Sequence, residues 1–258
     1  MAARQARCRH GETTAVSVDD SAATKLLPFV LSVIAGGVDT IGFLGIDGLF
    51  TAHVTGNLVI LAARFLTGGP APVAHLISVP VFVLALAMTK LLAGGLERFG
   101  IASLRPLLLL QFLLLSASLA ITTAAGPQVD PNTLIMVAAA MLMVLAMAVQ
   151  NALVRIALVG APSTAVMTTN ITAFTIDLGE MLIARDAIGI ARARSRAKHT
   201  WPAIAGFLLG CALGAPGENA IGLRALVLPA GLALVAVMLG VTVNPHPATR
   251  SSSVRGED

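Results

Sequence analysis

Long apolar runs alternate with short polar or glycine-containing stretches along most of the chain. At 1.5 Å per residue, a helix of about 20 residues crosses the hydrocarbon of a bilayer. Eight runs approach or exceed this length, at 26–46, 49–66, 73–96, 105–125, 132–156, 163–183, 200–216 and 223–243. The pattern predicts an all-α polytopic membrane protein with eight hydrophobic helical segments, of which six to eight cross the membrane.

Polar stretches lie at both ends of the chain and in one internal segment. Residues 1–24 and 244–258 have no apolar periodicity, so we expect disordered tails there. The eight apolar segments divide into two sets of four. This division predicts a first membrane repeat at 25–126 and a second at 127–243, which contains a basic loop at 184–199.

Composition supports the membrane assignment. Apolar residues make up 56% and charged residues 12% of the chain, and the mean hydropathy is +0.87, whereas soluble domains carry about 25% charged residues. The net charge of +4 does not indicate nucleic-acid binding, because the cations lie mainly in the tails and one loop, without interleaved aromatics. The two cysteines, Cys8 and Cys211, form no disulfide or metal pattern. No catalytic motif is present, so we expect no enzymatic activity, cofactor or metal.

Charge placement bears on the number of crossings. If all eight segments cross from a cytoplasmic N-terminus, 12 Lys and Arg lie inside and five outside. If segments 49–66 and 163–183 re-enter instead, the split is 15 to two, which the positive-inside rule favours. However, no Gly or Pro lies between Ser163 and Leu178, which favours a continuous spanning helix. We slightly favour eight helices and leave the topology open. Both versions place both termini in the cytoplasm and the basic loop near anionic headgroups.

Polar side chains interrupt the apolar runs at two places. The stretch from Gly48 to Asn57 contains Thr51, His53, Thr55 and Asn57, and Asp39 lies in the preceding run. Polar and ionisable groups are costly in a membrane interior, so these residues are candidates for a functional site. The alternative is that they form hydrogen bonds between helices.

A second copy of the motif lies 113 positions later. This shift places Thr51 on Thr164, Ala52 on Ala165, Thr55 on Thr168 and Asn57 on Asn170. Transporters are often built from internal repeats with the substrate site at their interface. An even number of crossings per repeat gives parallel halves and an odd number gives inverted ones, so the topology decides the symmetry.

The motifs resemble those of a known family. Gly37-Val38-Asp39, Gly48-Leu49-Phe50 and His53-Val54-Thr55-Gly56-Asn57 resemble the signature of the YoaK-like family of bacterial membrane proteins (domain of unknown function 1275). Gln150-Asn151-Ala152 with Thr168-Thr169 and Thr172 is similar to its second signature, although Asn170 departs from it. The resemblance covers about 25–243. It implies a bacterial plasma membrane protein and provides no substrate.

These observations favour a secondary transporter or channel for a small polar solute or ion. The predicted pathway residues are Asp39, His53, Thr55, Asn57, Gln150, Asn151, Thr168, Thr169 and Asn170. Arg64 and Asp177 occupy equivalent positions, so we predict an ion pair between the repeats. The alternative is a non-transporting scaffold or partner subunit in which the polar motifs only pack helices. Substrate, energy coupling and oligomeric state, including a homo-oligomer, stay open.

Overall fold

The computed structural model describes residues 22–68, 72–126 and 130–242, so almost all of both predicted tails lies outside the described residues. All regular elements in these ranges are helical. They are α1 (Ala22–Gly45), α2 (Thr55–Thr67), α3 (Val73–Arg98), α4 (Leu104–Ala125), α5 (Leu134–Ala157), α6 (Met167–Ile183), α7 (Ala187–Ile221), the 3-10 turn η1 (Gly222–Leu226) and α8 (Val227–Thr242).

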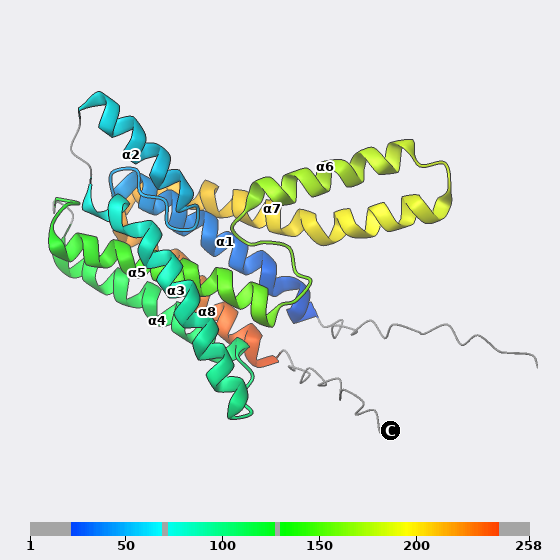
Figure 1. Cartoon of the computed structure of the whole chain (residues 1–258), viewed down its shortest axis with the longest axis horizontal. Coiled ribbons are helices and arrows are strands. Elements are labelled where there is room, and N and C mark those ends of the chain that lie inside the picture. The colour runs from blue at the N-terminus through cyan, green and yellow to red at the C-terminus, as the bar shows by residue number, and fades with distance from the viewer. Residues whose placement is uncertain (1–21, 69–71, 127–129, 243–258) are drawn as a thin grey trace, which may run out of the picture.

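The described residues form seven uninterrupted helical runs, not the eight that we predicted, because α7 and α8 are joined through η1. The expected break between 216 and 223 is instead a turn that begins at Gly222, whose φ of 63° suits glycine. The turn reverses the chain, so α7 and α8 run in opposite directions (Figure 1). The joined run of α7, η1 and α8 is 56 residues long, more than twice the length that one crossing needs.

Five stretches of the described residues are long and apolar enough to cross a membrane, which indicates a multi-pass membrane protein. They are Leu26–Gly45, Val73–Arg98, Leu104–Ala125, Leu134–Ala157 and Ala187–Thr242. The two ambiguous polar segments form shorter helices, since α2 has 13 residues and α6 has 17. At 1.5 Å per residue, α2 is about 20 Å long, which is too short to cross the hydrocarbon. The preference for eight spanning helices is therefore not supported.

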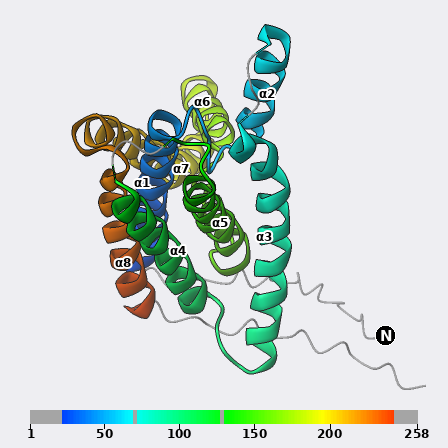
Figure 2. The ribbon, with the colours of Figure 1, turned by 90° about the vertical axis from the view of Figure 1, so that its left-hand side faces the viewer.

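The centre of the bundle is α1, which packs against α7, α8 and α5. Its apolar residues Leu27, Leu31, Ile34 and Val38 are fully buried. α5 is also largely buried and lies between α3 and α4 (Figure 2). The residues that the sequence marked as polar candidates on α1 and α5 therefore lie inside the bundle.

The predicted basic loop 184–199 is helical from Ala187 onward. Asp186 caps the helix by accepting a hydrogen bond from Gly189 N at 2.7 Å, and the alanines and arginines that follow are strong helix formers. Figure 1 shows α6 and the first half of α7 extending together beyond the rest of the bundle. We call this two-helix hairpin, α6 with residues 187–199, the α6–α7 arm.

Candidate functional site

Asp39 is buried on α1, where its carboxylate holds the loop that follows the helix. Asp39 Oδ1 accepts hydrogen bonds from Thr51 N at 2.7 Å, Thr51 Oγ1 at 2.9 Å and Ala52 N at 2.6 Å. The carboxylate thereby pairs with two backbone N–H groups that a helix would otherwise have paired. This is why residues 49–54 are not helical, although the sequence suggested one continuous segment from 49 to 66.

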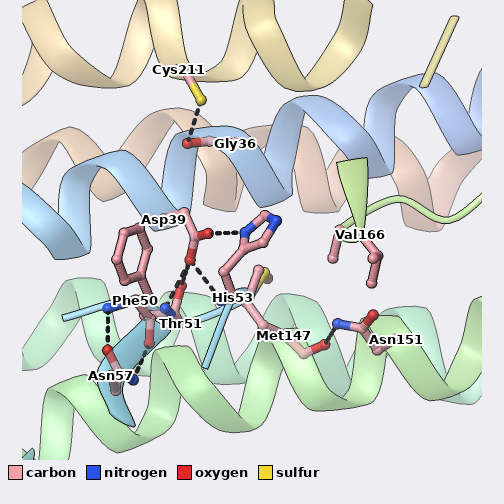
Figure 3. A network of polar contacts seen from close by, with 12 residues as sticks. Gly36, Asp39, Phe50, Thr51, His53, Asn57, Met147, Asn151, Val166 and Cys211 are labelled. Carbon is pink, nitrogen blue, oxygen red and sulfur yellow. Dashed lines mark hydrogen bonds and ion pairs between the residues drawn. The ribbon is translucent and has the colours of Figure 1, made fainter. Parts of the chain in front are cut away.

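His53 completes the environment of Asp39. Its Nδ1 lies 2.5 Å from Asp39 Oδ2 (Figure 3). Its ring packs edge-on against Phe207 of α7. The Asp39 side chain is 4% exposed, whereas that of His53 is 34% exposed. Imidazole is the side chain that most readily exchanges protons near neutral pH. The pair therefore joins a buried carboxylate to a base that is accessible at the edge of the bundle.

Asn57 closes the same loop from α2. Its Oδ1 accepts from Phe50 N at 2.8 Å, and its Nδ2 donates to Phe50 O at 2.8 Å and to Ser78 Oγ on α3 at 2.9 Å. Because Asn57 is fully buried and uses its amide on these three partners, it fixes the loop to α2 and α3.

Gln150 lies at the centre of a second buried cluster. Its Nε2 donates to Leu31 O on α1 at 2.8 Å and to Thr164 Oγ1 at 2.9 Å, and its Oε1 accepts from Gln111 Nε2 on α4 at 2.6 Å. Leu31 precedes Asp39 by eight residues, so the two clusters lie about 12 Å apart along α1.

Asn170 closes the loop before α6. Its Nδ2 donates to Ser163 O at 2.6 Å, and Ser163 Oγ accepts from Val166 N at 2.9 Å. These bonds satisfy the loop backbone without helical pairing, which is why α6 begins at Met167 and not at residue 163. The bond from Asn170 to Ser163 spans seven residues, as does the bond from Asn57 to Phe50.

The other predicted pathway residues lie apart from these clusters. Thr55 is exposed at the start of α2, and Thr168 and Thr169 are exposed on the first turn of α6. Asn151 is half-buried, and its Nδ2 donates to Met147 O of its own helix at 2.9 Å (Figure 3).

The predicted ion pair between Arg64 and Asp177 is wrong. Arg64 pairs with Asp47 at 2.8 Å, while Asp177 Oδ1 accepts from Arg196 Nε of α7 at 2.7 Å. Arg196 also pairs with Glu180. α2 and α6 run away from each other (Figure 1), so positions toward their C-terminal ends lie far apart.

Several residues of the clusters were missed as site residues. Thr51 and Thr164 each bind the buried polar side chain of the preceding helix, Asp39 and Gln150 respectively. Thr51 and Thr164 coincide when the sequence is shifted by 113 positions, and this coincidence could have identified them as site residues. Gln111, Ser78 and Phe207 come from other helices, and nothing in their local sequence marks them.

Comparison with known proteins bears on the resemblance seen in the motifs. A family model described as "Protein of unknown function (DUF1275)" matches residues 27–239, which covers most of the chain. No curated protein and no solved structure matches the chain. The resemblance predicted from the motifs is confirmed, and the chain belongs to the DUF1275 family.

Proposed function

We propose that this protein is a proton-coupled secondary transporter for a small polar solute or cation. In this proposal it is built from two inverted repeats, α1–α4 and α5–α8, with three crossings in each. The observation that carries the proposal is the contact between Asp39 and His53, an ionisable pair within the membrane bundle.

The packing pattern supports the repeat. α1 packs against α7 as α5 packs against α3, α1 packs against α8 as α5 packs against α4, and α2 packs against α3 as α6 packs against α7. Exchanging the two halves therefore leaves this set of helix pairs unchanged. α1 and α5 run in opposite directions in Figure 1, as inverted repeats require.

The location of the cations supports six crossings. The start of α1, the end of α8 and the α6–α7 arm lie toward the same end of the bundle (Figure 1). The connection from α3 to α4, with Arg98 and Arg105, also lies at this end, and Arg105 donates to Gly240 O and Val241 O of α8. By the positive-inside rule this end is cytoplasmic, with both termini. The plasma membrane is proposed because the resemblance of the motifs implies a bacterial plasma membrane protein.

The depth of Asp39 fits a coupling site. Asp39 lies three to four residues beyond the middle of the apolar stretch Leu26–Gly45, or about 5 Å from its centre. This position is well inside the hydrocarbon, which extends about 15 Å from the midplane. An ionisable group at such a depth is characteristic of a proton or substrate pathway.

The geometry gives the two carboxylate oxygens distinct partners. Asp39 Oδ1 accepts from three donors, whereas Oδ2 faces His53 Nδ1. In this proposal Nδ1 carries its hydrogen toward Oδ2, and His53 Nε2 is the atom that takes up and releases the coupled proton. A cation or polar solute that binds beside the pair would then be exchanged for, or carried with, this proton.

The hydrogen bonds reduce the number of residues that are candidates for the transport pathway. Asn57, Gln150 and Asn170 use their amides to hold loops and helices, which supports a packing role for them. Asp39 and His53 therefore remain as the candidates for coupling. The scaffold interpretation extends the packing role to these two residues as well.

Proton flux in liposomes tests the proposal. Purified protein is reconstituted with an internal pH dye, and a panel of small cations and polar solutes is added under an imposed pH gradient. We expect solute-dependent proton movement in the wild type and its loss in Asp39→Asn. The amide would present its NH₂ to His53 Nδ1, which must then accept, so Nε2 would carry the hydrogen and the proton site would be lost.

Glu97→Gln is the matched control, because it makes the same acid-to-amide change at an exposed position. It should transport as the wild type does. If Asp39→Asn and His53→Gln remain folded and move protons as fast as wild type with a responsive solute, Asp39 and His53 are not the coupling site. If no solute in a broad panel moves protons through the wild type, the scaffold interpretation is favoured.

A further inference from the structure

We propose that the α6–α7 arm is a binding surface for anionic phospholipid headgroups on the cytoplasmic side of the membrane. This inference does not depend on transport. It rests on three features: exposed apolar side chains at the tip of the arm, cations on α7, and a proline within α7 at the point where the arm leaves the bundle.

Large apolar side chains are exposed around the turn between α6 and α7. They include Leu182 at 87%, Ile183 at 79% and Ile188 at 65%. The two acidic residues of α6, Asp177 and Glu180, are both paired with Arg196 of α7. Soluble surfaces seldom expose several large apolar side chains together, so the tip of the arm is expected to be covered.

The α7 part of the arm supplies positive charge. Arg185 precedes the helix, and Arg192, Arg194 and Lys198 are exposed along it. Ala193 and Ala197 are buried and form the contact with α6, so the cations flank this contact and point away from the hairpin. A helical surface with exposed cations beside exposed Leu and Ile is characteristic of elements that lie in the membrane interface.

The connection to the bundle lets the arm reach the bilayer. Pro202 lies within α7 and has no N–H, so the carbonyl of Lys198 lacks its helical hydrogen bond there. Helices bend at such positions. Trp201, the single tryptophan of the chain, is next to it and is half-exposed. Tryptophan is enriched at the membrane–water interface, so this point marks the headgroup level.

The same end of the arm is also held to the bundle by a hydrogen-bond contact. His199 Nε2 lies 2.9 Å from Gly160 O in the loop between α5 and α6. An open groove of about 620 Å³ lies between α6 and α7 close to this contact, with the apolar side chains of Ala173 and Ile176 on one side and Ser195 and Thr200 on the other. The groove continues the amphipathic surface toward the headgroup level.

The sign of the charge favours lipid over a second copy of this chain. The arm extends toward the end of the bundle that also carries Arg98 and Arg105, so the same end of another copy would repel it. The cytoplasmic leaflet carries anionic lipids, and each Lys or Arg near such a surface strengthens binding roughly fivefold. Neutralising three cations should therefore weaken arm binding by about a hundredfold.

Hydrogen exchange of the full-length protein in nanodiscs tests the proposal. Discs contain one protein each and either phosphatidylcholine alone or phosphatidylcholine with phosphatidylglycerol. We expect the amides of residues 167–199 to exchange more slowly in the anionic discs, and Arg192→Gln/Arg194→Gln/Lys198→Gln to abolish this difference. The matched control, Lys90→Gln/Arg98→Gln/Arg224→Gln, removes three exposed cations elsewhere and should retain it.

A measurement on the wild type tests the proposal without relying on variants that could misfold. In wild type, 1 M salt shortens the Debye length to about 3 Å and should remove the protection that depends on phosphatidylglycerol. Equal exchange of the arm in both kinds of disc would overturn the proposal. Protection that appears only in discs holding two copies, whatever the lipid, would also overturn it and would identify the second copy as the cover.

Discussion

Gly210 provides the most direct test of how the bundle is held together. Gly210 of α7 faces α1, and a methyl group added there would lie 2.8 Å from Gly37 N and closer still to Val33 O. A carbon atom normally approaches backbone oxygen to roughly 3.3 Å. Both neighbours are backbone atoms, so no rotamer change can relieve the clash and the two helices must separate locally by roughly 1 Å.

This geometry sets the loss of stability that Gly210→Ala should cause. Overpacking costs about 1–3 kcal/mol when side chains can adjust, and Gly210→Ala should reach the upper end because backbone must move. At about 2–4 °C per kcal/mol for a chain of this size, 3 kcal/mol lowers Tm by roughly 6–12 °C. Separating α1 from α7 would also lift Phe207 away from His53, because their rings are in contact.

Gly231→Ala in α8 is the control for this prediction. It makes the same substitution inside a helix, but nothing lies within 4 Å of the added methyl group. Alanine should there stabilise the helix by about 0.5–1 kcal/mol. Thermal unfolding in lipid nanodiscs, followed by circular dichroism, compares the two. If both variants shift Tm in the same direction and by the same amount, the close contact between α1 and α7 does not stabilise the fold.

Two further predictions concern the loops and the arm. Asn57→Ala removes three hydrogen bonds of a buried side chain and leaves Phe50 N and O without these partners, which should cost about 2–5 kcal/mol in unfolding free energy. Asn170→Ala removes one hydrogen bond to Ser163 O and a weak contact with Met167 Sδ, and should cost only about 1–2 kcal/mol. Equal losses in denaturant titrations would contradict this assignment. Arg196→Gln leaves the buried Asp177 without its cation, so amides of α6 should exchange faster in deuterated buffer. Adding Asp177→Asn should reverse most of this effect. A double variant that exchanges as fast as the single variant would show that the ion pair does not hold the arm.

Much of the fold could be predicted from apolar patterning because helix length and hydrophobicity follow from local sequence. The start of α6 could not, because it depends on Asn170 reaching back to Ser163. Ser163, Thr164 and Asn170 looked like polar residues within one helix, whereas their side chains replace helical hydrogen bonds in the loop. The helical form of residues 187–199 was missed for a different reason, since their charge suggested a loop although Ala and Arg favour helix.

The predicted site shows the same division between local and non-local information. The costs of burying Asp39 and His53 single them out from sequence alone, and both lie in one cluster. The error over Arg64 and Asp177 arose because equal spacing was treated as proximity. In the arrangement of Figure 1, α2 and α6 point away from each other, so each finds a partner near its own end, Asp47 for Arg64 and Arg196 for Asp177.

The two loops that precede α2 and α6 differ in the chemistry that holds them. Asp39 holds the first loop with a carboxylate, which accepts from Thr51 and Ala52, whereas Gln150 binds Thr164 of the second loop with a neutral amide. Hydrogen bonds to a carboxylate are about twice as strong as those between neutral groups. Asp39 also makes three such bonds to its loop, and Gln150 makes one. The loop between α1 and α2 is therefore held more firmly by its buried side chain than the loop between α5 and α6 is.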